Sequence, residues 1–71
     1  MSDVPTLQMV FWKLGDWRCE YWRAAGQRRL IVFFRDEPLI DQPCPDAESV
    51  VKRSKEFRRL LEVAKQQAEL S

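Results

Sequence analysis

All four prolines and both glycines of this 71-residue chain lie before residue 46, and none follows it. Residues 46–69 are therefore predicted to form one long helix, with Asp46 as its N-cap and Glu48 complementing the helix dipole. Side chains of opposite charge recur four residues apart along it, a spacing that supports a helix. The stripe expected to face the core consists of Ala47, Val50, Val51, Ser54, Phe57, Leu61, Ala64 and Ala68.

Residues 7–40 have the composition of an antiparallel sheet. Three runs rich in large and β-branched side chains, at 7–14, 17–23 and 28–35, are separated by segments that contain glycine. Residues 38–40 add a short fourth strand in a second version of the prediction, at an edge because Pro38 cannot donate to a ladder. The sequence therefore predicts one α+β domain over 1–71, with three or four strands and one carboxy-terminal helix. Residues 1–6 are expected to be a flexible lead, and 41–45 a proline-rich linker.

The turns predict which side chains share a face of the sheet, since residues directly opposite each other do so. A two-residue turn at 15–16 pairs Val10 with Tyr21, and a four-residue loop at 24–27 extends the same face into the third strand. The face expected to lie under the helix holds Val10, Trp12, Leu14, Trp17, Cys19, Tyr21, Leu30, Val32 and Phe34.

The opposite face is also rich in apolar side chains, although one helix can cover only one face of the sheet. An apolar patch of this kind marks an interaction site. We expect homodimerisation through this face, and the alternatives are another protein partner or cover from the amino-terminal segment or the far end of the helix. The predicted interaction face consists of Met9, Phe11, Trp22, Ile31, Phe33 and, at the edge, Ile40.

Nucleic acid is a further candidate partner, because aromatic and basic side chains together on a sheet are typical of single-strand binders. The arrangement of a three-stranded sheet and one helix resembles that of the plant AP2-type and integrase amino-terminal DNA-binding domains. The resemblance covers the order of elements alone, so it assigns no residue. The net charge of +1 favours a protein partner instead. The candidate nucleic-acid contacts are Lys13, Arg18, Arg29 and Arg35.

The composition argues against catalysis, metal sites and cofactors. The chain has no histidine and only two cysteines, too few ligands for a structural zinc site. We expect Cys19 to be a buried apolar residue and Cys44 a free thiol, with no disulfide between them. We therefore expect no catalytic residues. No segment reaches the ~18 apolar residues of a membrane span, and no secretory signal is recognisable at the amino terminus, so we expect a cytoplasmic protein.

Overall fold

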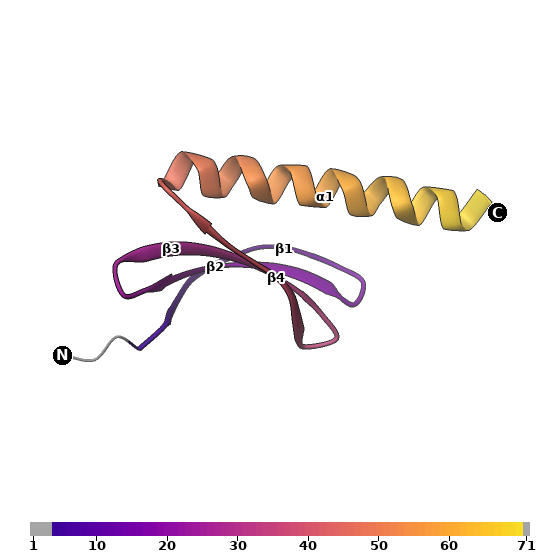
Figure 1. Cartoon of the computed structure of the whole chain (residues 1–71). Coiled ribbons are helices and arrows are strands. Elements are labelled where there is room, and N and C mark those ends of the chain that lie inside the picture. The colour runs from indigo at the N-terminus through magenta and orange to yellow at the C-terminus, as the bar shows by residue number, and fades with distance from the viewer. Residues whose placement is uncertain (1–3, 71) are drawn as a thin grey trace.

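The computed structural model describes residues 4–70, apart from the side chains of residues 69 and 70. Its elements are the strands β1 (Thr6–Leu14), β2 (Trp17–Ala24), β3 (Gln27–Phe34) and β4 (Glu37–Cys44), followed by the helix α1 (Ala47–Leu70). The strands form one antiparallel sheet in the order β1-β2-β3-β4, and α1 packs on one of its faces (Figure 1). The predicted α+β fold is therefore confirmed, in its four-stranded version.

The second hairpin has the register expected from the sequence. Cys19 of β2 lies opposite Val32 of β3, and the pairing continues to Ala24 and Gln27, which narrows the expected four-residue loop to two residues. Those two residues have φ angles of 52° (Ala25) and 75° (Gly26). Positive φ at both positions is the signature of a type I′ turn, whose twist matches that of the flanking strands.

The last hairpin turn is unusual because neither of its central residues is glycine. Arg35 and Asp36 have φ angles of 50° and 66°, in the left-handed region that L-residues rarely adopt. The turn is held by Asp16, whose backbone oxygen accepts a 3.0 Å hydrogen bond from the Arg35 N–H and whose carboxylate pairs with the guanidinium. Arg18 binds the Asp36 carboxylate. The first and last turns of the sheet are thereby joined.

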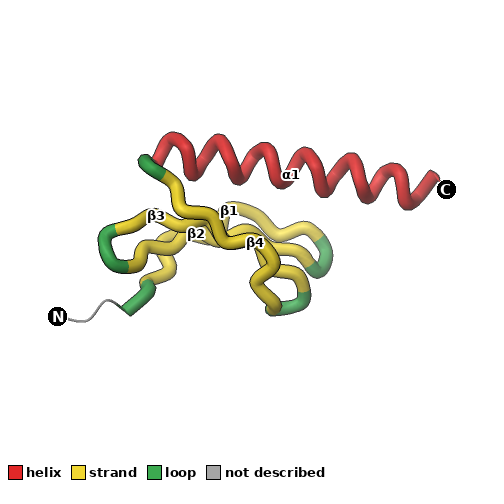
Figure 2. Tube along the Cα trace, in the orientation of Figure 1, coloured by secondary structure: helices red, strands yellow, loops and turns green. Residues whose placement is uncertain are grey.

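Strand β4 is longer than the expected piece at 38–40. It runs to Cys44, so the predicted linker at 41–45 shrinks to the two residues between β4 and α1 (Figure 2). The prolines within β4 are compatible with pairing because β4 is an edge strand, whose outer side needs no partner.

The helix begins one residue after Asp46, as an N-cap requires. The Asp46 carboxylate accepts a 2.7 Å hydrogen bond from the Ser49 N–H, and the hydrogen bonds from Ser49 lower the pKa of that carboxyl. Of the predicted stripe, Val50 and Ser54 are buried and Phe57 and Leu61 are half-buried. Val51, which lies a quarter of a turn away, is exposed.

The core lies between α1 and the sheet, with α1 placed mainly over β3 and β4. Its buried apolar residues are Trp12, Cys19, Leu30, Val32 and Val50. Trp12 reaches from β1 under the helix, where its indole Nε1 donates a 3.0 Å hydrogen bond to the backbone oxygen of Ser54. Large aromatic side chains thus cover the half of the sheet that one helix, about 10 Å wide, leaves open.

Candidate interaction surface

The structure places three of the six predicted interaction-face residues on the outer face, which is the side of the sheet turned away from α1. Trp22, Ile31 and Phe33 lie there, and all three are half-buried. Met9, Phe11 and Ile40 do not. The paired outer-face residues on β1 to β3 are Leu7, Val10, Lys13, Arg18, Glu20, Trp22, Ala24, Gln27, Arg29, Ile31 and Phe33.

The prediction for Met9 and Phe11 was wrong because β1 is irregular. Its register with β2 shifts twice, once between Leu7 and Met9 and once between Val10 and Trp12. Each shift inserts one unpaired residue and exchanges the faces that follow it. Tyr21 therefore lies opposite Met9, not Val10 as expected. The Phe11 ring stacks on the Tyr21 ring on the helix side, with centroids 6.1 Å apart.

The prediction for Ile40 was wrong because β4 is a full strand. Ile40 lies opposite Val32, whose side chain is buried under the helix, so Ile40 packs against the core. A further register shift follows, between this pair and the pair of Phe33 with Pro38. None of these irregularities has a glycine that would mark it in the sequence. Leu7 and Val10 were consequently missed as outer-face residues.

The centre of the outer face is occupied by a hydrogen-bonded network around Glu20, whose residue exposure is only 7%. One carboxylate oxygen of Glu20 accepts a 2.9 Å hydrogen bond from Trp22 Nε1, and the other accepts a 2.8 Å bond from Arg18 Nε. The Arg18 guanidinium also lies 4.2 Å from the centroid of the Phe33 ring. The apolar side chains of this face are thus partly covered by the chain's own polar groups.

The candidate nucleic-acid contacts are largely engaged in ion pairs. Arg29 Nε lies 2.8 Å from Asp41 Oδ1, and Arg35 Nε lies 3.3 Å from Asp16 Oδ2. Hydrogen bonds to Glu20 and Asp36 raise the pKa of Arg18, and the bond to Asp41 raises that of Arg29. Their positive charges therefore face carboxylates of the same chain. Lys13 lies on the same face and is exposed.

Among the described residues of the sheet, three of the four exposed large apolar side chains lie on β1, and the fourth, Leu39, lies on β4. Leu7, Met9 and Val10 are all exposed, although they lie on different faces, and Val4 is exposed just before the strand. Because β1 is an edge of the sheet, its outer backbone groups have no strand beside them. We call residues 6–10 with this open edge the β1 edge.

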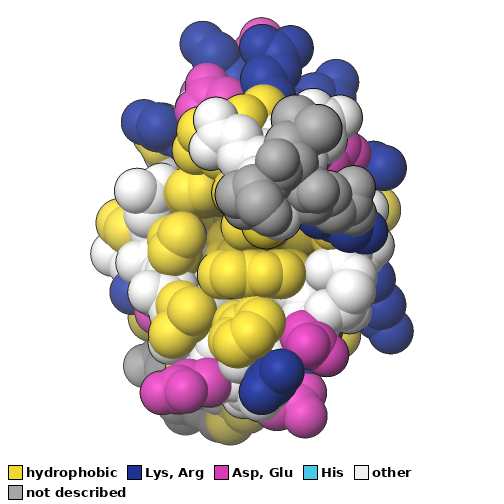
Figure 3. Space-filling model, turned by 90° about the vertical axis from the view of Figure 1, so that its right-hand side faces the viewer, with side chains coloured by type: hydrophobic (Ala, Val, Ile, Leu, Met, Phe, Trp, Pro, Cys, Tyr) yellow, Lys and Arg dark blue, Asp and Glu magenta, His cyan; other side chains and the backbone are white. Residues whose placement is uncertain are grey.

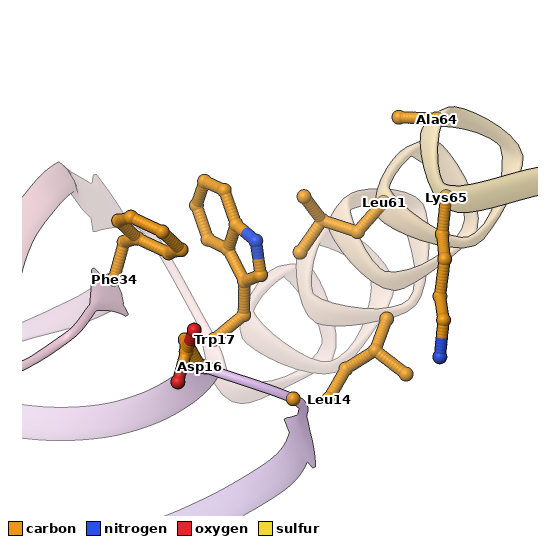
Figure 4. Close-up of a pocket in the computed structure, with 8 residues that line it drawn as sticks. Leu14, Asp16, Trp17, Phe34, Leu61, Ala64 and Lys65 are labelled. Atoms are coloured by element: carbon orange, nitrogen blue, oxygen red, sulfur yellow. The ribbon is translucent and has the colours of Figure 1, made fainter. Parts of the chain in front are cut away.

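A second apolar feature lies under the carboxy-terminal half of α1. The helix is about 36 Å long at 1.5 Å per residue, longer than the strands at roughly 26–30 Å, and it extends beyond them in Figure 1. Hydrophobic side chains gather on the side of the molecule that lies at the right in Figure 1 and faces the viewer in Figure 3. They line a groove of about 340 Å³ in which Trp17 lies between Phe34 and Leu61, with Leu14 and Lys65 beside it (Figure 4).

Among the residues that the structure describes, no cluster of three or more potential metal ligands is found. Both cysteines are free, as expected. Burial raises the pKa of the Cys19 thiol to about 12, and burial also raises that of Cys44, against the opposing effect of Arg53. The helix α1 is too polar to cross a membrane. It is the only helix among the residues that the structure describes.

Comparison with protein-family models, curated proteins and solved structures finds no match to this chain. Its function is therefore inferred from its own residues.

Proposed function

We propose that the protein is a noncatalytic interaction module that forms a homodimer through its sheet. The observation that carries the proposal is the exposure of Leu7, Met9 and Val10 on one edge strand. Side chains of this size on an edge are an association hazard for a monomer, and a second copy of the chain removes that hazard.

The outer-face residues alone are a less suitable contact than the sequence predicts. Stacking two such faces would press the Glu20 and Arg18 network of one copy against that of the other. Glu20 is already buried, but Arg18 and Arg29 would lose the water that they still contact, and removing a charge from water costs several kcal/mol unless new partners replace that water. The proposed contact is therefore centred on the edge strand β1, where Leu7 and Val10 are exposed.

The exposed area supports association. The chain exposes 5441 Å² of surface, whereas a monomer of its mass, 8.5 kDa, typically exposes about 4,700 Å². The difference is similar in size to the roughly 800 Å² that each partner buries in a standard interface, and both β1 and the exposed end of α1 contribute to it. The chain is also elongated and flat, with dimensions of 51 × 24 × 15 Å, which is consistent with its large exposed area. We place this module in the cytoplasm, a proposal that its two free cysteines support.

Sedimentation equilibrium between about 1 and 200 µM tests the proposal, a range in which weak and moderate dimers dissociate. We expect the apparent mass to rise from that of the 8.5 kDa monomer toward twice that value. A constant monomer mass over the whole range would refute homodimerisation.

Nucleic-acid binding is the alternative function, supported by the presence of Lys13, Trp22 and Phe33 on one face. The ion pairs of Arg18 and Arg29 weigh against it. This alternative requires retention of single-stranded DNA or RNA at low salt that weakens as salt rises. Lys13→Glu leaves the Glu20 network and the Asp16–Arg35 pair intact and should reduce such binding. Absence of retention by the wild-type chain would remove this alternative.

A further inference from the structure

We infer that the homodimer forms by antiparallel pairing of β1 with β1 of a second copy, around a two-fold axis at Met9. This inference rests on the proposed function and adds the segment, the direction and the register of the contact. The two four-stranded sheets would join into one continuous sheet. Since the axis is perpendicular to the sheet, both helices would lie on the same side of it.

The two edges of the sheet differ in how they oppose pairing. Strand β4 carries Pro38 and Pro43, which lack an N–H, and the acidic residues Glu37 and Asp41. Prolines, charges and β-bulges are devices by which natural edge strands avoid association. Both edges have register shifts, but over residues 6–12 β1 has no proline and no charge, whereas β4 has both. Of the two edges, β1 is therefore the one that accepts another strand.

The absence of charged residues around Met9 favours a second copy of the chain as the partner of β1. Near a two-fold axis each residue meets its own counterpart, so a charged surface would repel itself. The solvent side of α1 presents Lys52, Lys55 and Arg59, which disfavour a symmetric contact there, although Leu60 is exposed among them. Residues 4–12 are the longest stretch of the sequence without a charge.

Pairing with Met9 opposite its own counterpart also keeps the nearest charged residue of the strand, Lys13, away from its counterpart. It places Lys13 opposite Pro5 of the second copy, so the two lysines do not face each other. The register shifts beside Gln8 and Phe11 limit the regular ladder to a few residues. Packing of Met9 and Val10 around the axis therefore supplies most of the contact, with Leu7 next to it on the outer face.

Cysteine cross-linking tests the segment and the direction together, in a Cys44→Ser background that leaves only the buried Cys19. Met9→Cys and Leu39→Cys form a matched pair, because these residues are 54% and 53% exposed and lie on opposite edges. Under mild oxidation at a concentration where the dimer is populated, Met9→Cys should form a disulfide dimer and Leu39→Cys should not. Leu7→Cys should also fail, since two residues from the axis place its counterpart about 13 Å away.

Each departure from this pattern has a defined meaning. Equal cross-linking of Met9→Cys and Leu39→Cys, or none at Met9→Cys in a dimer, would overturn the β1 contact and leave homodimerisation standing. Cross-linking of Leu7→Cys as efficient as that of Met9→Cys would overturn the antiparallel register. A wild-type chain that stays monomeric would overturn the proposed function, and this inference with it.

A charge placed at the axis provides a second test that needs no oxidation. Met9→Lys should raise the dimer Kd at least tenfold, whereas Leu39→Lys should change it less than twofold. Far-UV circular dichroism of both variants checks that they are folded, as their exposure predicts. A Kd that responds equally to the two substitutions would contradict the β1 contact.

Discussion

Replacing Trp12 with phenylalanine tests how the helix is attached to the sheet. Trp12 is buried at 9% exposure, and its Nε1 donates the 3.0 Å hydrogen bond to the Ser54 backbone oxygen. Phenylalanine keeps one aromatic ring in the core but removes the donor and the second ring. The substitution therefore tests the hydrogen bond and the second ring of Trp12 while an aromatic side chain stays in the core.

The expected loss follows from two terms. A buried hydrogen bond contributes about 1 kcal/mol net, and the Ser54 oxygen loses that partner. The missing ring leaves a cavity of roughly 40 Å³, which costs about 1 kcal/mol. We expect the free energy of unfolding to fall by about 2 kcal/mol out of the ~4–10 kcal/mol typical of a chain this size. The midpoint of thermal unfolding should fall by roughly 8–16 °C.

Trp22→Phe is the matched control, because Trp22 also donates from its Nε1, over 2.9 Å to Glu20. Trp22 is half-buried on the outer face, so water can replace part of what is lost, and we expect a cost of about 1 kcal/mol or less. Urea unfolding followed by far-UV circular dichroism, at one fixed protein concentration, measures both variants. A smaller loss for Trp12→Phe than for Trp22→Phe would refute the assigned role of Trp12.

Three further predictions concern a turn, the helix cap and the thiols. Ala25→Gly should raise the free energy of unfolding by about 0.5–1 kcal/mol, because Ala25 has a φ of 52° and glycine adopts that angle without a Cβ penalty; urea midpoints measure it. The pKa of Asp46 is lowered from 3.8, so its stabilising effect is present above that pH and is lost as the pH falls through the lower native value. Asp46→Asn keeps the cap but removes this titration. When thermal unfolding is measured from pH 6 to 2 at about one-unit steps, the melting temperature of the variant should therefore fall less steeply below pH 4 than that of the wild type. A thiol reagent at about pH 8 should modify Cys44 in the native chain before Cys19, whose pKa is about 12 and whose exposure is 0%; equal rates in a mass-spectrometric time course would contradict this.

Much of the fold could be predicted because local rules decide it. The absence of glycine and proline after residue 45 and the Asp46 cap predicted α1 to within one residue at each end. The register of β2 with β3 was also predicted, since glycine marks the turn and the two strands are regular. Trp22, Ile31 and Phe33 were correctly placed on the outer face for that reason.

The candidate site could be predicted only in part, because an unmarked irregularity changes every face beyond it. Gln8 and Phe11 have no feature that distinguishes them from neighbours in a regular strand, yet the shifts beside them exchanged Met9 and Val10. Ile40 was misplaced for a related reason, since only the pairing of β4 along its whole length brings it over the core.

The amino-acid sequence by itself determined the order of elements, the single long helix and the surplus of apolar side chains over what one helix can cover. These depend on turn residues and on periodicity, which act over a few neighbouring positions. Only the tertiary structure decided where that surplus is exposed. The Glu20 network lies within β2, and Arg18 connects it to the Phe33 ring of β3 and to Asp36 in the turn that follows β3. Such contacts cover the centre of the outer face and leave β1 open, because they depend on which side chains the sheet brings together.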